Sequence, residues 1–234
     1  MFFVQRETQV KANPKIRIEK NGPYVVTGNV PLTEKSIEPK GKGYVYKDQC
    51  TFPPKEEYHL CRCGKTKDSP FCDGAHVASG FHSTEIASRA PYDERAQVFV
   101  GPGLDLMDDD RCAFGRFCHT RDGNVWELID KSDNPEYREE AINAACDCPT
   151  GRLVAVDKSG GKFERDFEPS IDIVQDPEKN VSCGIFVKGS IPLESADGSV
   201  YEIQNRYALC RCGASRNVPF CDATHVPLHF RDKR

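Results

Sequence analysis

Short stretches of alternating hydrophobic and polar residues dominate the first sixty positions of the chain. Ile16 and Ile18 alternate with charged residues, and the hydrophobic segment 24–26 follows an Asn-Gly-Pro sequence at 21–23. Alternation with a period of two places every second side chain on one face of a β-strand, and Asn, Gly and Pro favour turns. This part of the chain is therefore expected to form short strands joined by turns.

The same pattern returns near the other end of the chain. Residues 26–32 read VTGNVPL and residues 187–193 read VKGSIPL, while YHL at 58–60 is matched by YAL at 207–209. The offset between the copies falls from 161 to 149 residues, which places an insertion of twelve residues within 35–54 of the first copy. The composition of this insertion is that of an exposed surface segment. We therefore expect an internally duplicated, strand-rich module.

Residues 78–168, between the two copies, have a different pattern. The apolar sequence VWELI at 125–129 predicts a strand. Ser-Asp-Asn-Pro at 132–135 predicts the start of a helix, because a capping side chain precedes a proline at the first helical position. The apolar stripe of this helix consists of Ala141, Ile142 and Ala145. The helix is expected to end at CDCPTG, 146–151, where proline cannot continue it.

Composition favours several small units over one large core. Hydrophobic residues make up 38% of the 234 positions and charged residues 29%, and the net charge is −4. Small units with little apolar surface commonly need bound cofactors to stabilise them. The acidic net charge gives no support for a nucleic acid as partner. The twelve cysteines are spaced as in metal sites and not as in a secreted disulfide framework.

The chain shows no sign of a membrane span or a targeting segment. None of its apolar runs approaches the ~20 residues that cross a bilayer. The first fifteen residues lack the apolar core of a signal peptide, and Glu7 argues against a transit peptide. These features predict a soluble protein of the reducing cytoplasm, with no membrane partner.

One cysteine pattern follows each copy of the strand module. Residues 61–76 read CRCGKTKDSPFCDGAH and residues 210–225 read CRCGASRNVPFCDATH, so both follow the spacing C-x-C-x8-C-x3-H. Three thiols and an imidazole form a complete set of four metal ligands. The predicted ligands are Cys61, Cys63, Cys72 and His76 in the first site, and Cys210, Cys212, Cys221 and His225 in the second.

The spacing predicts how each set converges. Two cysteines separated by one residue of a strand present both sulfurs to the same side, and a cysteine and a histidine four residues apart share one face of a helical turn. Asp73 and Asp222, directly after the third cysteine, are expected to cap the free amides of that turn. Because Gly74 is replaced by Ala223 in the second copy, no glycine conformation is expected there.

Three cysteines and one histidine suit structural zinc as well as an iron–sulfur cluster. The single residue between the first two ligands favours a cluster, because paired zinc ligands are usually separated by two or more residues. The residues C-x-C-G-x5-P-F-C-D-x2-H resemble the CDGSH (NEET) iron–sulfur family, whose members bind a [2Fe–2S] cluster through three cysteines and one histidine. Both copies match at every ligand, at the proline and at the aspartate, and differ at the small residues after it.

The resemblance implies two [2Fe–2S] clusters. The best-known members of this family are homodimers of chains with one motif, which share a β-sandwich. The two modules of this chain are accordingly expected to pair about a pseudo-twofold axis, giving a monomer that contains an intramolecular pseudo-dimer.

A third cysteine group lies between the two repeats. C-x5-C at 112–118 followed by C-P-T-G at 148–151 resembles the divergent single-cluster ferredoxin domain over roughly residues 95–160. The resemblance implies a [4Fe–4S] cluster on Cys112, Cys118 and Cys148. Three thiolates alone suit a [3Fe–4S] cluster, whereas a [4Fe–4S] cluster normally takes four. Cys146 is the favoured fourth ligand and His119 the alternative, while a zinc site or unligated core cysteines also remain possible.

Four further residues near these sites carry weaker expectations. Cys50 and Cys183 lie outside every motif and are expected to be small buried hydrophobic residues. Arg62 and Arg211 lie between the paired cysteines and are expected to point away from the sulfurs, toward solvent or a partner.

These observations predict an α+β fold of mostly short strands. Two CDGSH-type β modules with metal loops, residues 1–80 and 169–234, flank a small ferredoxin-like α+β domain at 81–168. No motif for catalysis on a substrate is found, so an electron carrier is predicted, relaying single electrons from a reductase to an acceptor metalloenzyme or oxygenase. Cluster transfer or redox sensing is one alternative, and a zinc-stapled interaction module is another.

Overall fold

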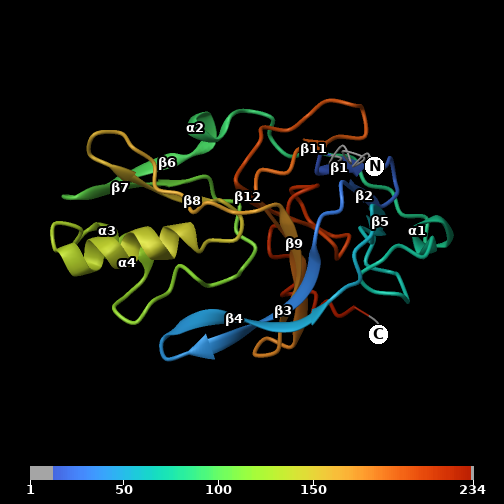
Figure 1. Ribbon diagram of the computed structural model, residues 1–234, viewed down its shortest axis with the longest axis horizontal. Helices are drawn as coiled ribbons and strands as arrows, with labels where there is room; N and C mark the ends of the chain where they lie inside the picture. The colour runs from blue at the N-terminus through green and yellow to red at the C-terminus, as the bar shows by residue number, and fades with distance from the viewer. Residues whose placement is uncertain (1–12, 233–234) are drawn as a thin grey trace, which may run out of the picture.

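The computed structural model describes residues 13–232, which form three β-sheets and four short helices (Figure 1). The first sheet consists of β11 (Leu193–Glu194), β1 (Lys15–Ile18), β2 (Tyr24–Thr27) and β5 (Glu57–Leu60), in this order. The second consists of β12 (Arg206–Leu209), β10 (Val181–Lys188), β9 (Ser170–Asp176), β3 (Leu32–Lys40) and β4 (Gly43–Thr51). The third consists of β6 (Gln97–Val100), β7 (Leu104–Asp108) and β8 (Leu153–Asp157). The helices are α1 (Ala75–Ala78), α2 (Tyr92–Arg95), α3 (Val125–Ile129) and α4 (Pro135–Cys146).

Each of the two larger sheets includes part of the other copy of the repeat: the first sheet takes β11 from the second copy, and the second sheet takes β3 and β4 from the first. β11 of the second copy pairs in parallel with β1 of the first, with Leu193 opposite Ile16. β3 of the first copy pairs in parallel with β9 of the second, with Leu32 opposite Ile171. Leu32 and Leu193 occupy the same position of the repeat, so the two exchanges are equivalent. The two modules therefore form one intramolecular body with pseudo-twofold symmetry.

A shared hydrophobic core holds this body together. Its buried residues come from both copies, among them Ile16 and Val26 from the first and Ile173, Ile185 and Leu209 from the second. Burying one such side chain contributes about 1.5–3 kcal/mol. Because each exchanged segment extends the edge of the other copy's sheet, the two copies interlock in space over the described residues.

The inserted segment of the first copy is a hairpin made of β3 and β4. Its outer strand β4 is largely exposed along its second half, as expected for residues 35–54. Its inner strand differs from that expectation, because Ile37 is fully buried in a second hydrophobic cluster with Phe117 and Phe186. The pairing of β3 with β9 turns this side of the insertion toward the core.

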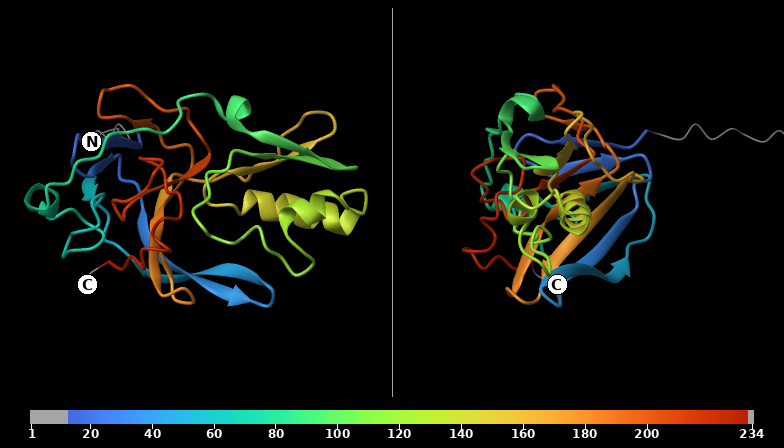
Figure 2. Two further views of the ribbon diagram at one scale, coloured as in Figure 1. Left: turned by 180° about the vertical axis from the view of Figure 1, so that it is seen from behind. Right: turned by 90° about the vertical axis from the view of Figure 1, so that its left-hand side faces the viewer.

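The central domain is a three-stranded antiparallel sheet on which α3 and α4 pack (Figures 1 and 2). Asn134 caps α4 and Pro135 follows it, as predicted. The strand predicted at 125–129 is wrong, since this segment is helix α3. A capping box explains the difference: Asn124 accepts a hydrogen bond from the amide of Glu127, whose carboxylate accepts one from the amide of Asn124.

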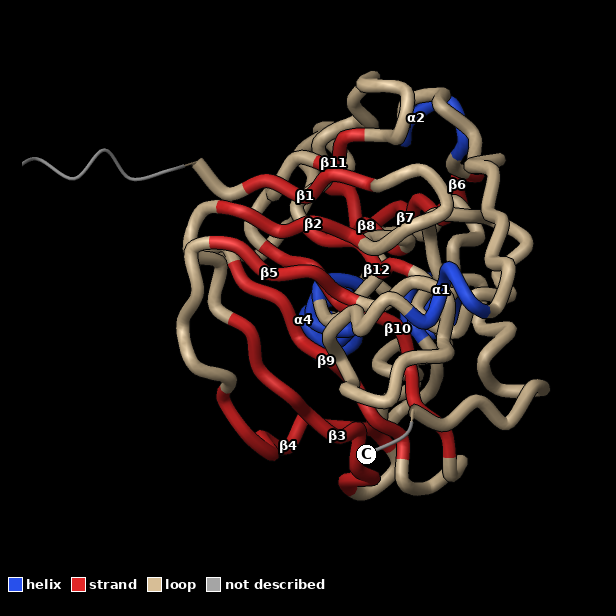
Figure 3. The backbone as a smooth tube through the Cα atoms, turned by 90° about the vertical axis from the view of Figure 1, so that its right-hand side faces the viewer, coloured by secondary structure: helices blue, strands red, loops and turns tan. Residues whose placement is uncertain are grey.

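Loops make up much of the chain outside the sheets, as the colouring in Figure 3 shows. In the part of the chain that the structure describes, no helix has both the length and the apolar character needed to cross a membrane. The N-terminal residues considered above for a targeting signal lie, as far as residue 12, outside the described part.

Candidate metal centres

The first Cys3His site forms where β5 ends. The amide of Cys61 donates to the carbonyl of Pro70 at 2.9 Å, and the amide of Cys72 donates to the carbonyl of His59 at 2.9 Å. These two bonds place the end of the loop beside its beginning. The sulfurs of Cys61 and Cys63 lie 3.7 Å apart, and the sulfur of Cys72 lies 3.4 Å from His76 Nδ1.

The second site repeats this arrangement at the end of β12. The amide of Cys210 donates to Pro219 at 2.8 Å, and that of Cys221 donates to the carbonyl of Ala208 at 2.9 Å. The sulfurs of Cys210 and Cys212 lie 3.6 Å apart, and the sulfur of Cys221 lies 3.5 Å from Nδ1 of His225. All eight predicted ligands are thus brought together in two equivalent sets.

The donor distances fit pairs of ligands on tetrahedral metal ions. Two sulfurs bound at ~2.3 Å to one tetrahedral ion are roughly 3.8 Å apart, and a sulfur and an imidazole nitrogen roughly 3.5 Å apart. Each site contains one pair of either kind. Within residues 13–232, no three Cys, His, Asp or Glu side chains lie close enough to hold a single ion. The measured pairs, two sulfurs and a sulfur with an imidazole nitrogen, fit the two irons of a [2Fe–2S] cluster, each iron taking one pair.

An aspartate braces each loop: its bond to an amide of the turn was predicted, and its bond across the loop was not. Asp73 accepts hydrogen bonds from the amides of Lys67 and Ala75, at 2.9 and 3.0 Å. Asp222 does the same with the amides of Arg216 and Thr224, at 2.8 and 3.1 Å. In both copies one carboxylate thus ties the loop between the second and third cysteines to the turn that carries the histidine.

The expectation that no glycine conformation is needed after this aspartate is wrong. Gly74 has φ of 85°, and Ala223 at the matching position has φ of 65°. Both residues lie in the left-handed region, where a Cβ atom meets steric resistance. The turn therefore requires this conformation in both copies, and the second copy adopts it with an alanine.

Backbone amides also surround the ligand sulfurs. Burial raises the pKa of Cys63 to about 11, and the amide of Lys65 opposes the shift by stabilising the thiolate. Burial likewise raises the pKa of Cys72, and the amide of Gly74 opposes it. In the second site the amide of Ala214 acts on Cys212. Metal binding in such a site must displace thiol protons, and the amides favour the charged sulfurs that remain.

Two arginines between the paired cysteines support the loops from within. Arg62 and Arg211 are buried, so the expectation that they face solvent or a partner is wrong. Arg62 donates to the carbonyl of Gly22 at 2.9 Å, and Arg211 donates to that of Cys183 at 2.7 Å. They hold the Cys-x-Cys segments, which follow strands β5 and β12, against neighbouring backbone.

The two metal loops touch one another. A Cβ atom added to Gly64 would lie 2.6 Å from the carbonyl oxygen of Cys212, and one added to Gly213 would lie 2.6 Å from that of Cys63. Each Cys-x-Cys-Gly segment thus packs backbone to backbone against its counterpart, so only glycine fits at either position.

The two sites differ in their exposure to solvent. Cys72 and His76 are partly exposed, whereas Cys221 is 3% and His225 2% exposed. Burial lowers the pKa of His225 to about 4, which keeps its imidazole neutral as a metal ligand. Its Nε2 is one of the buried polar atoms of the described chain that have no hydrogen-bond partner. Identical ligand sets therefore occupy different surroundings.

The central cysteines form a third group beside the end of α4. Burial raises the pKa of Cys118 to about 12, and the neighbouring thiols of Cys148 and Cys112 raise it further. The amide of Phe114 donates to the Cys112 sulfur at 3.3 Å. Gly115 packs closely on Pro149, which directly follows Cys148. The loop 112–118 and the Cys-Pro segment thus bring the three predicted sulfurs together.

The structure does not bring Cys146 to this group. Its sulfur lies 3.6 Å from the carbonyl oxygen of Phe163, and the charged groups that act on it are Arg206, Arg165 and Asp147. His119, the alternative, is exposed. The structure thus places Cys112 and Cys148 near Cys118, and the assignment of these three as ligands stays a prediction, as does the fourth ligand.

The two cysteines outside the motifs differ from one another. Cys183 is 1% exposed, as expected, but Cys50 lies on the outer strand β4 and is exposed, so its predicted burial is wrong. β4 is an edge strand of its sheet, which leaves this position open to solvent.

Two arginines that join the central domain to the second site escaped the sequence analysis. Arg206, at the start of β12, donates to the carbonyls of Cys148, Ala145 and Leu153. Arg111, beside Cys112, covers the ring of Phe220. The one available signal for Arg206 was a difference between the copies, since the matching position of the first holds Glu57.

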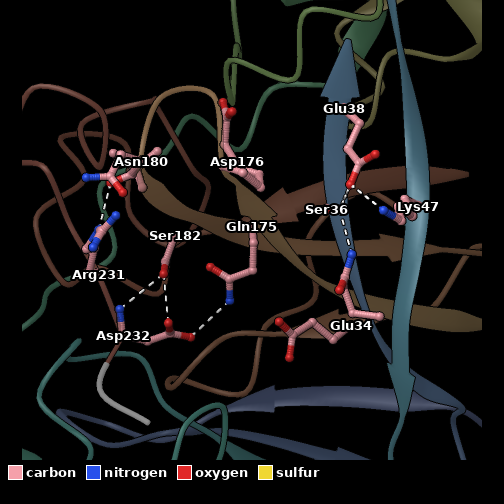
Figure 4. Close-up of a pocket in the computed structure, with 13 residues that line it drawn as sticks. Glu34, Ser36, Glu38, Lys47, Gln175, Asp176, Asn180, Ser182, Arg231 and Asp232 are labelled. Atoms are coloured by element: carbon pink, nitrogen blue, oxygen red, sulfur yellow. Dashed lines mark hydrogen bonds and ion pairs between the residues drawn. The ribbon is translucent and has the colours of Figure 1, made fainter. Parts of the chain in front are cut away.

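A polar cavity of about 460 Å³ lies away from the cysteine groups, between the second sheet and the C-terminal segment (Figure 4). Asp232 lines one side of this cavity and accepts hydrogen bonds from Ser182 at 2.8 Å and Gln175 at 3.2 Å. Asp232 also accepts one from Ser69, in the first metal loop, and pairs with Arg211 at 2.5 Å, in the second. This carboxylate thus links both loops.

Comparison with protein-family models agrees with these three centres. Residues 21–77 and 184–226 match the model described as iron-binding zinc finger CDGSH type. Residues 101–158 match the model described as divergent 4Fe-4S mono-cluster. Neither curated proteins nor solved structures gave a significant match. The chain thus consists of two CDGSH-type iron-binding domains, joined in one pseudo-symmetric body, on either side of a divergent single-cluster 4Fe–4S domain.

Proposed function

We propose that the protein is a one-electron carrier with two [2Fe–2S] clusters and one [4Fe–4S] or [3Fe–4S] cluster. The observation that carries this proposal is the pairing of donors. In each repeat, two sulfurs lie at the distance expected for two ligands of one tetrahedral ion, and so do a sulfur and an imidazole nitrogen. Domains of these kinds are typical of carriers that perform no catalysis on a substrate.

Bound clusters supply one-electron chemistry, and the chain's residues set the conditions for it. His76 and His225 each replace a thiolate by a neutral ligand, which makes the site less negative and raises its potential above that of an all-cysteine site. Backbone amides at the sulfurs favour the additional negative charge of the reduced state. Burial of Cys210, Cys221 and His225 keeps water away from three of the four donors of the second site.

The electron donor and acceptor are proposed to be a reductase and a metalloenzyme or oxygenase. The partly exposed first site supports exchange with a protein partner. His76 lies there on α1 beside Val77, which is 76% exposed. An exposed apolar residue next to a partly exposed ligand suits a transient redox contact.

The proposal is tested by metal analysis and EPR on anaerobically purified protein, before and after dithionite. Roughly eight irons per chain, with [2Fe–2S] and [4Fe–4S] signals, are expected, and about seven indicate a [3Fe–4S] centre. About four irons would show that only the repeated sites are loaded. Zinc without iron would refute the electron-carrier function and favour a stapled interaction module.

Cluster transfer is a second candidate function, favoured by the exposure of the first site. A partly exposed histidine ligand offers protons and acceptor ligands a way to the metal that the buried His225 does not. If transfer occurs, an apo-ferredoxin acceptor should gain a cluster, and His76→Cys should slow this gain while the matched His225→Cys should not. Equal effects of the two substitutions would contradict transfer from the first site.

A further inference from the structure

Arg111 connects the central domain to the second Cys3His site. Its side chain is 9% exposed, and its guanidinium carbon lies 4.2 Å from the centre of the Phe220 ring. Arg111 directly precedes the central ligand Cys112, and Phe220 directly precedes the second-site ligand Cys221. One buried cation is therefore next to a predicted ligand of the central centre along the chain, and through space it contacts the ring of the residue next to a predicted ligand of the second.

The first site has no such connection at its matching ring. A cation also lies over Phe71, which precedes Cys72, but it is Lys55, with its Nζ 4.6 Å from the ring centre. Lys55 belongs to the first module and is exposed to solvent. The duplication thus offers two equivalent cation–ring contacts, only one of which leads to the central domain.

Two further observations place the central cysteines beside the second site. Arg206, on the strand that leads into Cys210, donates to the carbonyl of Cys148 at 2.6 Å. A cavity of about 620 Å³ is lined by Cys112 from the central group and by Asp222, the residue after Cys221, from the second site.

The first site, in turn, is joined to the second. Gly64 and Gly213 bring the two Cys-x-Cys-Gly backbones into direct contact. The central centre therefore contacts the second Cys3His site through packed residues, and the second site contacts the first, so the second site lies in the middle.

We propose that Arg111 couples the central centre to the second Cys3His site, and that electrons pass between the central centre and the first site by way of the second. This inference rests on the electron-carrier function proposed above. With clusters bound, one electron would leave the central centre, oxidising it, and would reduce the second site, and no covalent bond would form or break. The electron originates from a low-potential one-electron reductant, which in the test is dithionite.

Charge gives Arg111 its effect. A cation favours reduction of a nearby site, because reduction adds a negative charge, and the interaction is stronger where water is excluded. Arg111 is buried and its Nε lies 3.7 Å from the carboxylate of Asp109, which without Arg111 would keep Arg95 alone as a counter-charge within the described chain, whereas Lys55 is exposed to solvent. Loss of Arg111 should therefore lower the potentials of the central and second centres together.

The test is an EPR-monitored redox titration of the full chain with Arg111→Met, Arg111→Lys and the matched control Lys55→Met. The signals of the repeated sites are assigned with His76→Cys and His225→Cys, each of which changes one of them. Arg111→Met should shift the midpoint potentials of the central and second centres to more negative values and leave the first unchanged. Arg111→Lys should restore most of the shift, and Lys55→Met should move the first site alone.

A second measurement uses the unaltered chain, so it does not depend on how a variant folds. In fully reduced protein the paramagnetic central centre should speed the spin relaxation of the second-site signal more than that of the first. Equal relaxation of the two signals, or potentials that Arg111→Met leaves unchanged, would overturn this inference while the three redox-active centres still support the carrier function. A protein that contains zinc and has no reducible signal would refute both.

Discussion

Arg206 is the residue whose loss should most weaken the contact between the central domain and the second module. Its side chain is 2% exposed and donates to the carbonyls of Cys148 at 2.6 Å, Ala145 at 2.9 Å and Leu153 at 3.0 Å. It also forms an ion pair with Glu164. In Arg206→Met the side chain fills much of the same space but offers no donor.

The expected cost follows from the acceptors left behind. Each buried polar group that loses its partner costs about 1–3 kcal/mol. Three carbonyls are affected, while Glu164 is 32% exposed and regains water. Because water can reach some acceptors after local relaxation, we expect Arg206→Met to lower the free energy of unfolding by about 3–5 kcal/mol. That is a large part of the roughly 5–15 kcal/mol that stabilises a typical protein.

Urea unfolding followed by circular dichroism measures this loss, and EPR reports on the central centre in the same samples. Arg206→Lys keeps the charge with fewer donors and should fall between the parent and Arg206→Met. The matched control is Glu57→Met at the equivalent exposed position of the first copy, which should change stability by no more than about 0.5 kcal/mol. A loss below about 1 kcal/mol for Arg206→Met would refute the reasoning that these bonds hold the two domains together.

Three further predictions concern the metal loops. Gly74→Ala should destabilise the protein by about 1 kcal/mol in urea unfolding and Ala223→Gly should stabilise it by a similar amount, because both positions have left-handed backbones; effects of the same sign would contradict this. His76→Cys should lower the midpoint potential of the first site and reduce its pH dependence in redox titrations, and an unchanged potential would remove His76 as a ligand. Burial raises the pKa of Asp232, but Arg211 and hydroxyl hydrogen bonds outweigh it and hold this pKa below the ordinary value. A pKa that is lower in the folded state than in the unfolded state stabilises the protein above the unfolded-state pKa of ~3.9, and this stabilisation is lost in more acidic solution. In urea unfolding, Asp232→Asn should therefore be less stable than the parent at pH 7, and the difference should shrink below about pH 4. A difference independent of pH would refute the carboxylate's role.

The ligands of the two repeated sites were accessible from sequence because their chemistry is local. A complete donor set lies within sixteen residues, and its repetition identifies it. The helix start at Asn134-Pro135 was accessible for the same reason, since a cap acts on its own turn. The short apolar segment 125–129 was not, because five such residues suit a strand or a helix, and the capping box decides between them.

Other features depend on contacts that no local pattern records. β3 and β11 each pair with a sheet of the other copy, and this pairing completes the hydrophobic core that the two copies share. The left-handed backbone at Ala223 follows from the turn that brings His225 to Cys221, although an alanine at this position predicts a right-handed or extended backbone. The roles of Arg111 and Arg206 appear only once the central domain lies against one copy of the repeat.

Duplication gives this protein two identical donor sets, and the insertion of a different domain between the copies makes them unequal. The strand exchange joins both sites in one body with shared sheets. The copies then differ where the central domain meets them: Arg206 in the second corresponds to Glu57 in the first. A difference in potential between the two sites must therefore arise from surroundings and not from ligands. The contact of Arg111 with Phe220 and the burial of His225 both distinguish the second site from the first, which supports the proposals that the second site is an internal relay and that the first exchanges electrons with partners.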